Sequence, residues 1–387
     1  MTDTPLGHEA GAVPEDGAGV APDDGAGTPS EEGASLVDQA VVVCCGPGGV
    51  GKTTVAAAVA LEGARRGRRS VVVTIDPARR LADALGLDSL SNTPTAIAGS
   101  WPGELWALML DTKSTFDALV TKYANDPQQA QAILANRFYR NISGALSGTQ
   151  EYMAMEKLYE LHDSGQFDLI VVDTPPTRNA LDFVDAARRL TRLLDNRIFR
   201  LLMLPTRVSL KAVNFAGQTL LKPIAKVVGA DVVTDAVTFF QAFEGMEEGF
   251  RQRAQRVDAL LSDPGTAFVV VATPRPDVVA EADFFATKLG DAGITVTALV
   301  VNRMHPRYGD EWSEVDRERA RTLAGTPLGT LYDNLADLHQ LADGEEVHVA
   351  DLVARVAPAP ALRVPVLAGD VHDLDGLAQI GTLLFPG

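Results

Sequence analysis

Val41-Val42-Val43-Cys44-Cys45-Gly46-Pro47-Gly48-Gly49-Val50-Gly51-Lys52-Thr53-Thr54 is the stretch that decides the fold of this 387-residue chain. A β-branched run enters a glycine-rich loop, and helix-forming sequence follows from Val55 to Ala64. The pattern G-x-x-x-x-G-K-T is complete from Gly46 to Thr53, which predicts a phosphate-binding loop between a strand and a helix.

Each residue type in this loop matches the chemistry of a nucleoside triphosphate. Glycines lack Cβ atoms, so backbone N–H groups can curl around phosphate oxygens, and the start of the helix adds free N–H groups and a positive dipole end. Lys52 is expected to neutralise β/γ-phosphate charge, and the Thr53 hydroxyl to ligate Mg²⁺. The residues predicted to hold the nucleotide are Gly46, Gly48, Gly49, Val50, Gly51, Lys52, Thr53 and Thr54.

Composition and charge narrow the class of protein. The formal net charge is −17, of which residues 1–38 hold nine acidic side chains and no Lys or Arg, leaving −8 for the rest. Residues 1–38 lack an apolar pattern and are predicted to be disordered. An acidic chain is a poor candidate for nucleic-acid binding, and no stretch reads as a transmembrane segment or a signal peptide. We expect a soluble, cytoplasmic protein that does not bind nucleic acid.

Strands and helices alternate along the chain. Strands are predicted at 40–46, 70–76, 105–110, 167–173, 267–273 and 295–302, with 88–103 as a loop and 357–367 as a Pro-rich crossing. Helices are predicted at 53–66, 78–85, 114–123, 125–165 (broken near 143–148), 178–194, 278–290, 313–323 and 374–384. The pattern indicates an α/β fold with a mostly parallel sheet and helices on both faces. We expect residues 39–387 to form this domain. Within it, we expect residues from about 114–162 and 190–262 to form a helical insertion subdomain.

Several polar residues lie where predicted strands end, at the sheet edge where ligands of such folds bind. Asp76 is either an acid/base for an attacking water or a helix N-cap. Asp173 ends an apolar strand, which is the Walker B pattern of Mg²⁺ coordination. The stiff Thr174–Thr177 segment suits a loop that senses the γ-phosphate. Asn302 is either an adenine contact or a turn residue.

Together these motifs resemble the ArsA-type ATPases, a deviant Walker A group related to MinD and ParA. The likeness rests on the loop, Asp76-Pro77-Ala78, Asp173-Thr174-x-Pro176-Thr177, Val301-Asn302 and Gly148-Thr149-Gln150-Glu151, and covers about residues 40–385.

The resemblance implies roles for these residues. Asp76 would be the catalytic acid/base of the first switch, together with Lys52, while Thr53 and Asp173 would hold Mg²⁺. Asn302 and the segment near Pro365 would contact the adenine of ATP. The family acts as a dimer, so a homodimer or a heterodimer with a paralogue is expected. A hydrophobic client would bind the helical subdomain, although ordinary helix–helix packing also accounts for most of its apolar faces.

The sequence departs from the family pattern at three places. Pro47 replaces the signature lysine that reaches the nucleotide of the opposite subunit. Neither the zinc-binding C-x-x-C nor the clustered arsenite-binding cysteines of some members are found. Arg275 stands where some relatives have a glutamate near the base, which weakens the expectation of adenine selectivity.

The sequence therefore predicts an Mg²⁺-dependent ATPase whose dimer opens and closes with ATP hydrolysis. Three alternatives stay open: an arsenite-efflux motor, a MinD/ParA-like positioning protein, and a weakly hydrolysing subunit of a heterodimer, which Pro47 favours.

Overall fold

The first strand lies inside an eight-stranded sheet with the order β3-β4-β2-β5-β1-β6-β7-β8. All neighbouring strands are parallel except β3 and β4. The structure, a computed structural model, describes residues 36–75, 80–142, 149–175, 186, 188, 191–192, 230–243, 245–309 and 313–386. The strands are β1 (Val41–Cys45), β2 (Arg69–Thr74), β3 (Thr95–Ile97), β4 (Glu104–Met109), β5 (Leu169–Asp173), β6 (Thr266–Ala272), β7 (Val296–Met304) and β8 (Ala361–Pro365).

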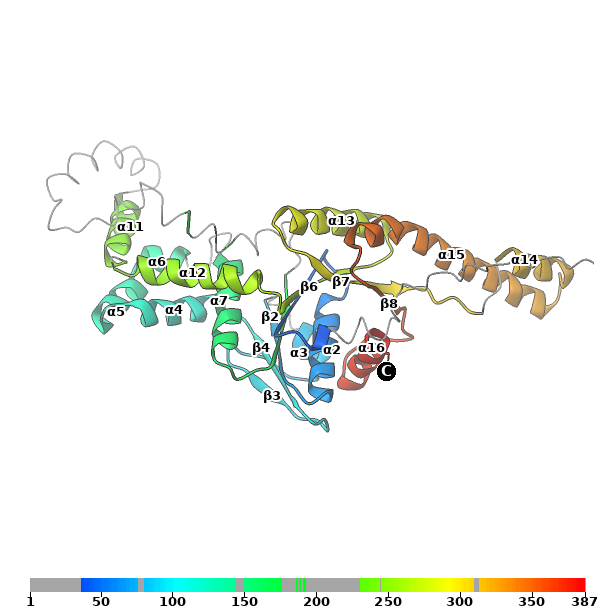
Figure 1. Ribbon diagram of the computed structural model, residues 1–387, viewed down its shortest axis with the longest axis horizontal. Coiled ribbons are helices and arrows are strands. Elements are labelled where there is room, and N and C mark those ends of the chain that lie inside the picture. The colour runs from blue at the N-terminus through cyan, green and yellow to red at the C-terminus, as the bar shows by residue number, and fades with distance from the viewer. Residues whose placement is uncertain are drawn as a thin grey trace, which may run out of the picture.

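Helices cover this sheet and extend beyond it on two sides (Figure 1). They are α2 (Lys52–Arg65), α3 (Arg80–Ala84), α4 (Thr112–Tyr123), α5 (Pro127–Ala135), α6 (Arg137–Ile142), α7 (Thr149–Asp163), α11 (Ala230–Ala242), α12 (Glu247–Leu261), α13 (Pro276–Asp291), α14 (Ser313–Thr322), α15 (Pro327–Val356) and α16 (Leu374–Leu384). The predicted α/β fold with a mostly parallel sheet is confirmed.

The centre of the sheet is apolar throughout, as a sheet covered on both faces requires. All five residues of β1 are buried, and β1 pairs with β5 on one side and β6 on the other. Helix α2 packs against β1, β2 and β5 and is covered in turn by α16. Its alanine-rich sequence permits this close approach, because small side chains let a helix lie near its neighbours on several sides.

A group of helices extends from one side of the sheet, on the left of Figure 1, and consists of α4, α5, α6, α7, α11 and α12. Stacked and tilted aromatic rings join this group. The ring centroid of Phe239 lies 5.6 Å from that of Phe138 and 6.0 Å from that of Tyr139, and the centroids of Phe243 and Phe250 lie 5.0 Å apart. Most of the predicted helix 178–194, and all of 195–229, lies outside the described residues.

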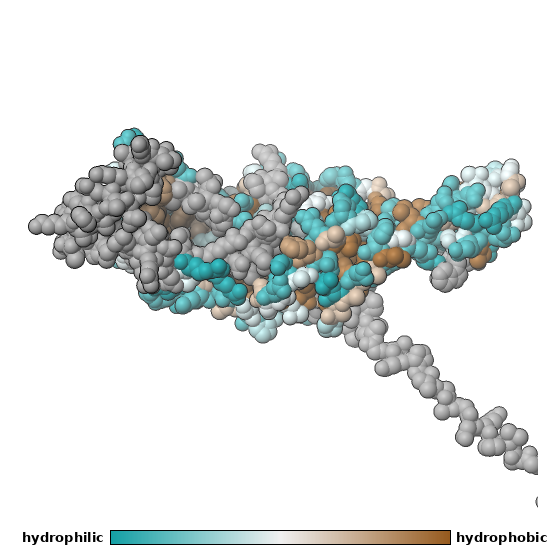
Figure 2. Space-filling view, turned by 90° about the horizontal axis from the view of Figure 1, so that it is seen from above, coloured by the Kyte–Doolittle hydropathy of each residue, from teal (hydrophilic) through white to brown (hydrophobic). Residues whose placement is uncertain are grey.

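Helices α14 and α15 pack on each other and lead away from the sheet on the opposite side, which gives the molecule its elongated outline (Figure 1). The imidazole of His339 is buried between them, with Nδ1 2.9 Å from Asp316 Oδ2 and Nε2 2.8 Å from the Tyr308 carbonyl. Figure 2 shows hydrophobic surface near the root of this arm and a mainly hydrophilic tip. No helix of the described residues is long and apolar enough to cross a membrane.

Three predictions about individual elements were wrong. Thr95–Ile97, expected within a loop, forms β3 along the edge of β4. Ala361–Pro365, expected in a crossing, forms β8 beside β7. Leu36 and Val37, expected in a disordered tail, are buried as part of the hydrophobic core, and Arg68 donates hydrogen bonds to the Val37 and Gln39 carbonyls. Residues 1–35 lie outside the described residues.

Candidate nucleotide site

The glycine-rich loop follows β1 and is held in a conformation that only glycine adopts easily. Gly46 has a φ of 143°, and a Cβ atom there would lie 2.2 Å from the Val271 carbonyl oxygen of β6. Gly51 has a φ of 95°, and its Cβ would lie 2.3 Å from the Asn302 amide nitrogen. Close contacts on both sides therefore fix the path of the loop into α2.

Lys52 is the first residue of α2 and is buried. Its ammonium group donates hydrogen bonds to the carbonyls of Gly46 (3.0 Å) and Pro47 (2.8 Å). The side chain thus spans the interior of the loop, where its positive charge lies among the backbone groups predicted to surround phosphate. Gly48 lies exposed on the turn of the loop, and Val50 is buried beneath it.

Two strand ends bring a carboxylate to the hydroxyl of the loop. Thr53 donates a hydrogen bond of 2.8 Å to Oδ2 of Asp173, and Thr74 at the end of β2 donates another of 2.9 Å to the same oxygen. Asp173 is buried at the end of β5. A hydroxyl and a carboxylate oxygen at hydrogen-bond distance form a donor set that suits Mg²⁺, a hard cation that prefers oxygen ligands.

The two predicted switch segments start from the same edge. Thr174 is fixed to β1, because its N–H (3.2 Å) and its hydroxyl (2.9 Å) both donate to the Cys44 carbonyl. Ile75 donates its N–H to the Asp173 carbonyl (3.1 Å) and accepts a hydrogen bond of 2.9 Å from the Gln150 amide of α7. Asp76 itself lies outside the described residues, as do Pro176 and Thr177.

Asn302 of β7 contacts the loop. Its Nδ2 donates to the Val50 carbonyl at 2.8 Å, and its Oδ1 accepts the N–H of Arg303 at 2.9 Å. Pro365 lies beside Met304 in β8 and does not line the pocket described next. Residues 370–372, a few positions further along the chain, do line it.

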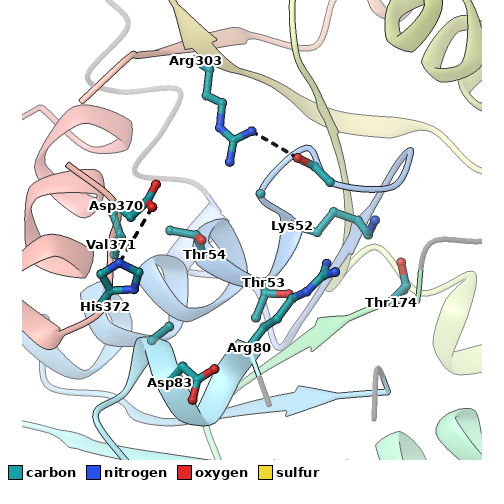
Figure 3. Close-up of a pocket in the computed structure, with 13 residues that line it drawn as sticks. Lys52, Thr53, Thr54, Arg80, Asp83, Thr174, Arg303, Asp370, Val371 and His372 are labelled. Atoms are coloured by element: carbon teal, nitrogen blue, oxygen red, sulfur yellow. Dashed lines mark hydrogen bonds and ion pairs between the residues drawn. The ribbon is translucent and has the colours of Figure 1, made fainter. Parts of the chain in front are cut away.

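A pocket of about 390 Å³ opens beside the loop (Figure 3). Its lining includes the predicted Gly49, Gly51, Lys52, Thr53, Thr54 and Thr174, together with Arg80, Asp83, Ala84, Arg303, Asp370, Val371 and His372. Two arginines that line this pocket, Arg80 and Arg303, are not among the site residues predicted from the sequence. Arg303 follows a predicted strand end directly, so the argument that selected Asn302 could have found it.

Arg303 has a φ of 60°, which is uncommon for a residue other than glycine. The register of β7 against β8 shifts between Asn302 and Met304, so Arg303 occupies an irregular position in the strand. Its guanidinium extends toward the loop and lies 3.4 Å from the Gly49 carbonyl (Figure 3). A local distortion of β7 therefore aims this cation at the pocket.

Arg275 and the two cysteines lie apart from this pocket. Arg275 is exposed and pairs with Asp277 at 2.8 Å. Cys44 and Cys45 are buried in β1, and burial raises the pKa of both thiols. Adjacent residues of a strand point to opposite faces of the sheet, so the two thiols do not face one common ligand.

Comparison with known proteins identifies the family. A family model described as anion-transporting ATPase matches residues 39–339. The chain belongs to this ArsA family. The chain is therefore an ATPase, and the resemblance to the ArsA-type ATPases that its motifs indicated is confirmed.

Relatives of this ATPase come from distant organisms. A protein of Aquifex aeolicus named as an arsenical pump-driving ATPase is 21% identical over 89% of this chain and 78% of its own length. An uncharacterized protein of Streptomyces coelicolor is 32% identical over 69% of this chain and 63% of its own. An ATPase ASNA1 homolog of Paramecium tetraurelia is 24% identical over 88% of this chain and 90% of its own length.

Proposed function

We propose that this ATPase hydrolyses ATP in an Mg²⁺-dependent reaction and couples it to the opening and closing of a dimer that handles a client or partner. The observation that supports the site best is the convergence of Lys52, Thr53 and Asp173. A cation and a hydroxyl from the start of α2 and a carboxylate from the end of β5 lie around one loop. Phosphoryl transfer needs positioning and charge neutralisation more than covalent chemistry, and this set supplies both.

Each site residue has a role in this proposal. The loop backbone holds the phosphates, and Lys52 leaves the Gly46 and Pro47 carbonyls to contact the β/γ-phosphates. Thr53 and Asp173 would hold Mg²⁺, which would neutralise phosphate charge and orient the γ-phosphate. Asp76 orients the attacking water and accepts its proton. Asn302 and the segment after Pro365 border the adenine.

Coupling to the helical group runs through α7. The first turn of α7 contacts Ile75, the residue before Asp76. The middle of α7 contacts α12, because Arg253 Nε of α12 donates a hydrogen bond of 2.6 Å to Glu156 Oε2 of α7. A change in the first switch would therefore move α7 and, with it, the helices α4–α6, α11 and α12. We propose that these helices form the subdomain whose apolar face binds a hydrophobic client, and that the protein works in the cytoplasm.

One alternative has specific support. Pro47 removes the lysine that the family directs at the opposite nucleotide, which favours a weakly hydrolysing subunit paired with a lysine-bearing paralogue. An arsenite-efflux motor is disfavoured, since its ligands would be Cys44 and Cys45, which are buried at adjacent positions of β1 and point to opposite faces of the sheet.

Two variants test the proposed site. Lys52→Ala is expected to abolish ATP binding or hydrolysis without unfolding the protein, because the cation facing the phosphates is lost. Asp76→Asn is expected to keep ATP·Mg²⁺ binding and lose turnover, because an amide of the same shape cannot accept the proton. Phosphate release and fluorescent-nucleotide titration measure the two effects. Hydrolysis at the original rate in Lys52→Ala would refute the assignment.

A further inference from the structure

The cations that border the pocket differ in what holds them. Lys52 donates to two loop carbonyls, and Arg303 reaches the Gly49 carbonyl. His372, which is charged only if protonated, has its Nε2 3.9 Å from Asp370 Oδ2. For Arg80, no hydrogen bond or ion pair joins the guanidinium to another residue within the described part of the chain. Arg80 is thus a cation in the pocket whose charge the described structure does not use.

The position of Arg80 relates it to the phosphate end of the pocket. Arg80 is the first residue of α3 and is exposed. Figure 3 shows its side chain extending past Thr53, with the guanidinium directed into the space that Lys52 and Thr174 also border. Lys52 and Thr53 are the residues expected to contact the β/γ-phosphates and Mg²⁺, so this is the end where the γ-phosphate would lie.

The loop itself lacks one cation. Position 47 is proline, whose carbonyl accepts a hydrogen bond from Lys52 and whose side chain carries no charge. Charge that develops on the γ-phosphoryl oxygens must be met by other groups, and a planar guanidinium matches two phosphate oxygens at once. An arginine can serve this role from within the same chain.

We propose that Arg80 is a catalytic residue that contacts the γ-phosphate of ATP bound to its own subunit. In the reaction the water oxygen bonds to the γ-phosphorus, the bond to the β–γ bridging oxygen breaks, and ADP leaves with the electron pair. The water proton passes to the proposed base Asp76. Arg80 stabilises the oxygens of the transferring group. This inference deepens the proposed ATP hydrolysis and rests on it.

The test compares Arg80→Ala and Arg80→Lys with a matched control, Arg65→Ala, which removes an exposed arginine from the far end of α2. For Arg80→Ala, kcat is expected to fall about 100-fold or more, while the Kd for ADP stays within about threefold of wild type. Arg80→Lys should recover part of the loss. The complex with Mg²⁺, ADP and aluminium fluoride, which mimics the transferring phosphoryl group, should weaken in parallel with kcat.

Mixing two inactive variants separates contact within a subunit from contact across a dimer. Arg80→Ala mixed with Lys52→Ala should stay inactive, because no single subunit has both residues. Recovery of turnover on mixing would overturn the proposal, as would wild-type kcat and wild-type aluminium fluoride binding in Arg80→Ala. A wild-type protein that neither binds ADP nor hydrolyses ATP would instead refute the proposed function, so the two failures are distinguishable.

Discussion

Gly46 carries the tightest backbone constraint in the loop, and a single methyl group tests it. The Cβ of Gly46→Ala would lie 2.2 Å from the Val271 carbonyl oxygen, so the loop must move away from β6. We expect affinity for ADP to fall by about tenfold to a hundredfold, from about 1–3 kcal/mol of strain. Titration with a fluorescent ADP analogue measures the loss.

Gly49→Ala is the matched control for this prediction. Gly49 also has a positive φ, 77°, but nothing lies within 4 Å of its Cβ position. Gly49→Ala should lose less affinity for ADP than Gly46→Ala, because it bears only the conformational cost of a positive φ and no clash. Equal losses in the two variants would mean that the contact with Val271 does not hold the loop.

At this scale the sequence predicted residues with a motif and missed those without one. Lys52, Thr53 and Asp173 follow from the loop pattern and from an apolar strand that ends in an acid, and the structure brings all three together. Arg80 belongs to no pattern, because an arginine beside a loop is ordinarily a solvated surface residue, and Arg303 was overlooked although it directly follows the predicted strand end at Asn302. Only the fold of α3 and the irregularity of β7 bring them to the pocket.

The contact between α7 and α12 depends on a buried ion pair. Glu156 and Arg253 are 1% and 4% exposed, and burial raises the pKa of Glu156, partly offset by hydrogen bonds and charge from Tyr152 and Arg253. Arg253→Met leaves the carboxylate without its cation. We expect this variant to lose about 3–5 kcal/mol of unfolding free energy, measured by urea denaturation.

Arg251→Ala on the same helix is the control, because Arg251 pairs with the exposed Glu248. This variant should lose only about 0–1 kcal/mol of unfolding free energy. A double variant with Glu156→Gln should recover much of the loss from Arg253→Met. If the two single arginine variants are equally stable, the pair does not join the helices.

Elements with a clear period were predicted well, and elements defined by their neighbours were not. Strands β1, β2, β5, β6 and β7 are continuous apolar runs, which the sequence shows directly. Strand β3 has three residues and forms only along β4. Helix α15 runs for 30 residues, and its buried positions from Gly329 to Val356 recur at helical spacing but include the polar His339 and Glu345. Its helical period was overlooked in the sequence, and only α14 was expected there.

Pro47 bears on how two copies of the whole molecule would meet. In Pro47→Lys we expect the added cation to reach the nucleotide of the opposite subunit and to strengthen the nucleotide-bound dimer about tenfold, as one charge-assisted contact of roughly 1.5–3 kcal/mol allows. Native mass spectrometry across a range of protein concentrations, with ADP and aluminium fluoride, measures the dimer.

Pro47→Ala removes the ring without adding charge and is the matched control. It should dimerise as the wild type does. Unchanged dimerisation in Pro47→Lys would mean that the two copies do not approach each other at this loop, which would count against a dimer of the family type.

Helix α7 contacts Ile75 beside the nucleotide site at one end and Arg253 of α12 near its middle. If both sites bias the same helix, thermodynamic linkage makes their influence mutual. A ligand of α11 and α12 must then change the affinity for nucleotide by the same factor by which nucleotide changes the affinity for that ligand. Nucleotide affinity measured in cell extract fractions would then report the presence of an unknown binding partner before that partner is identified.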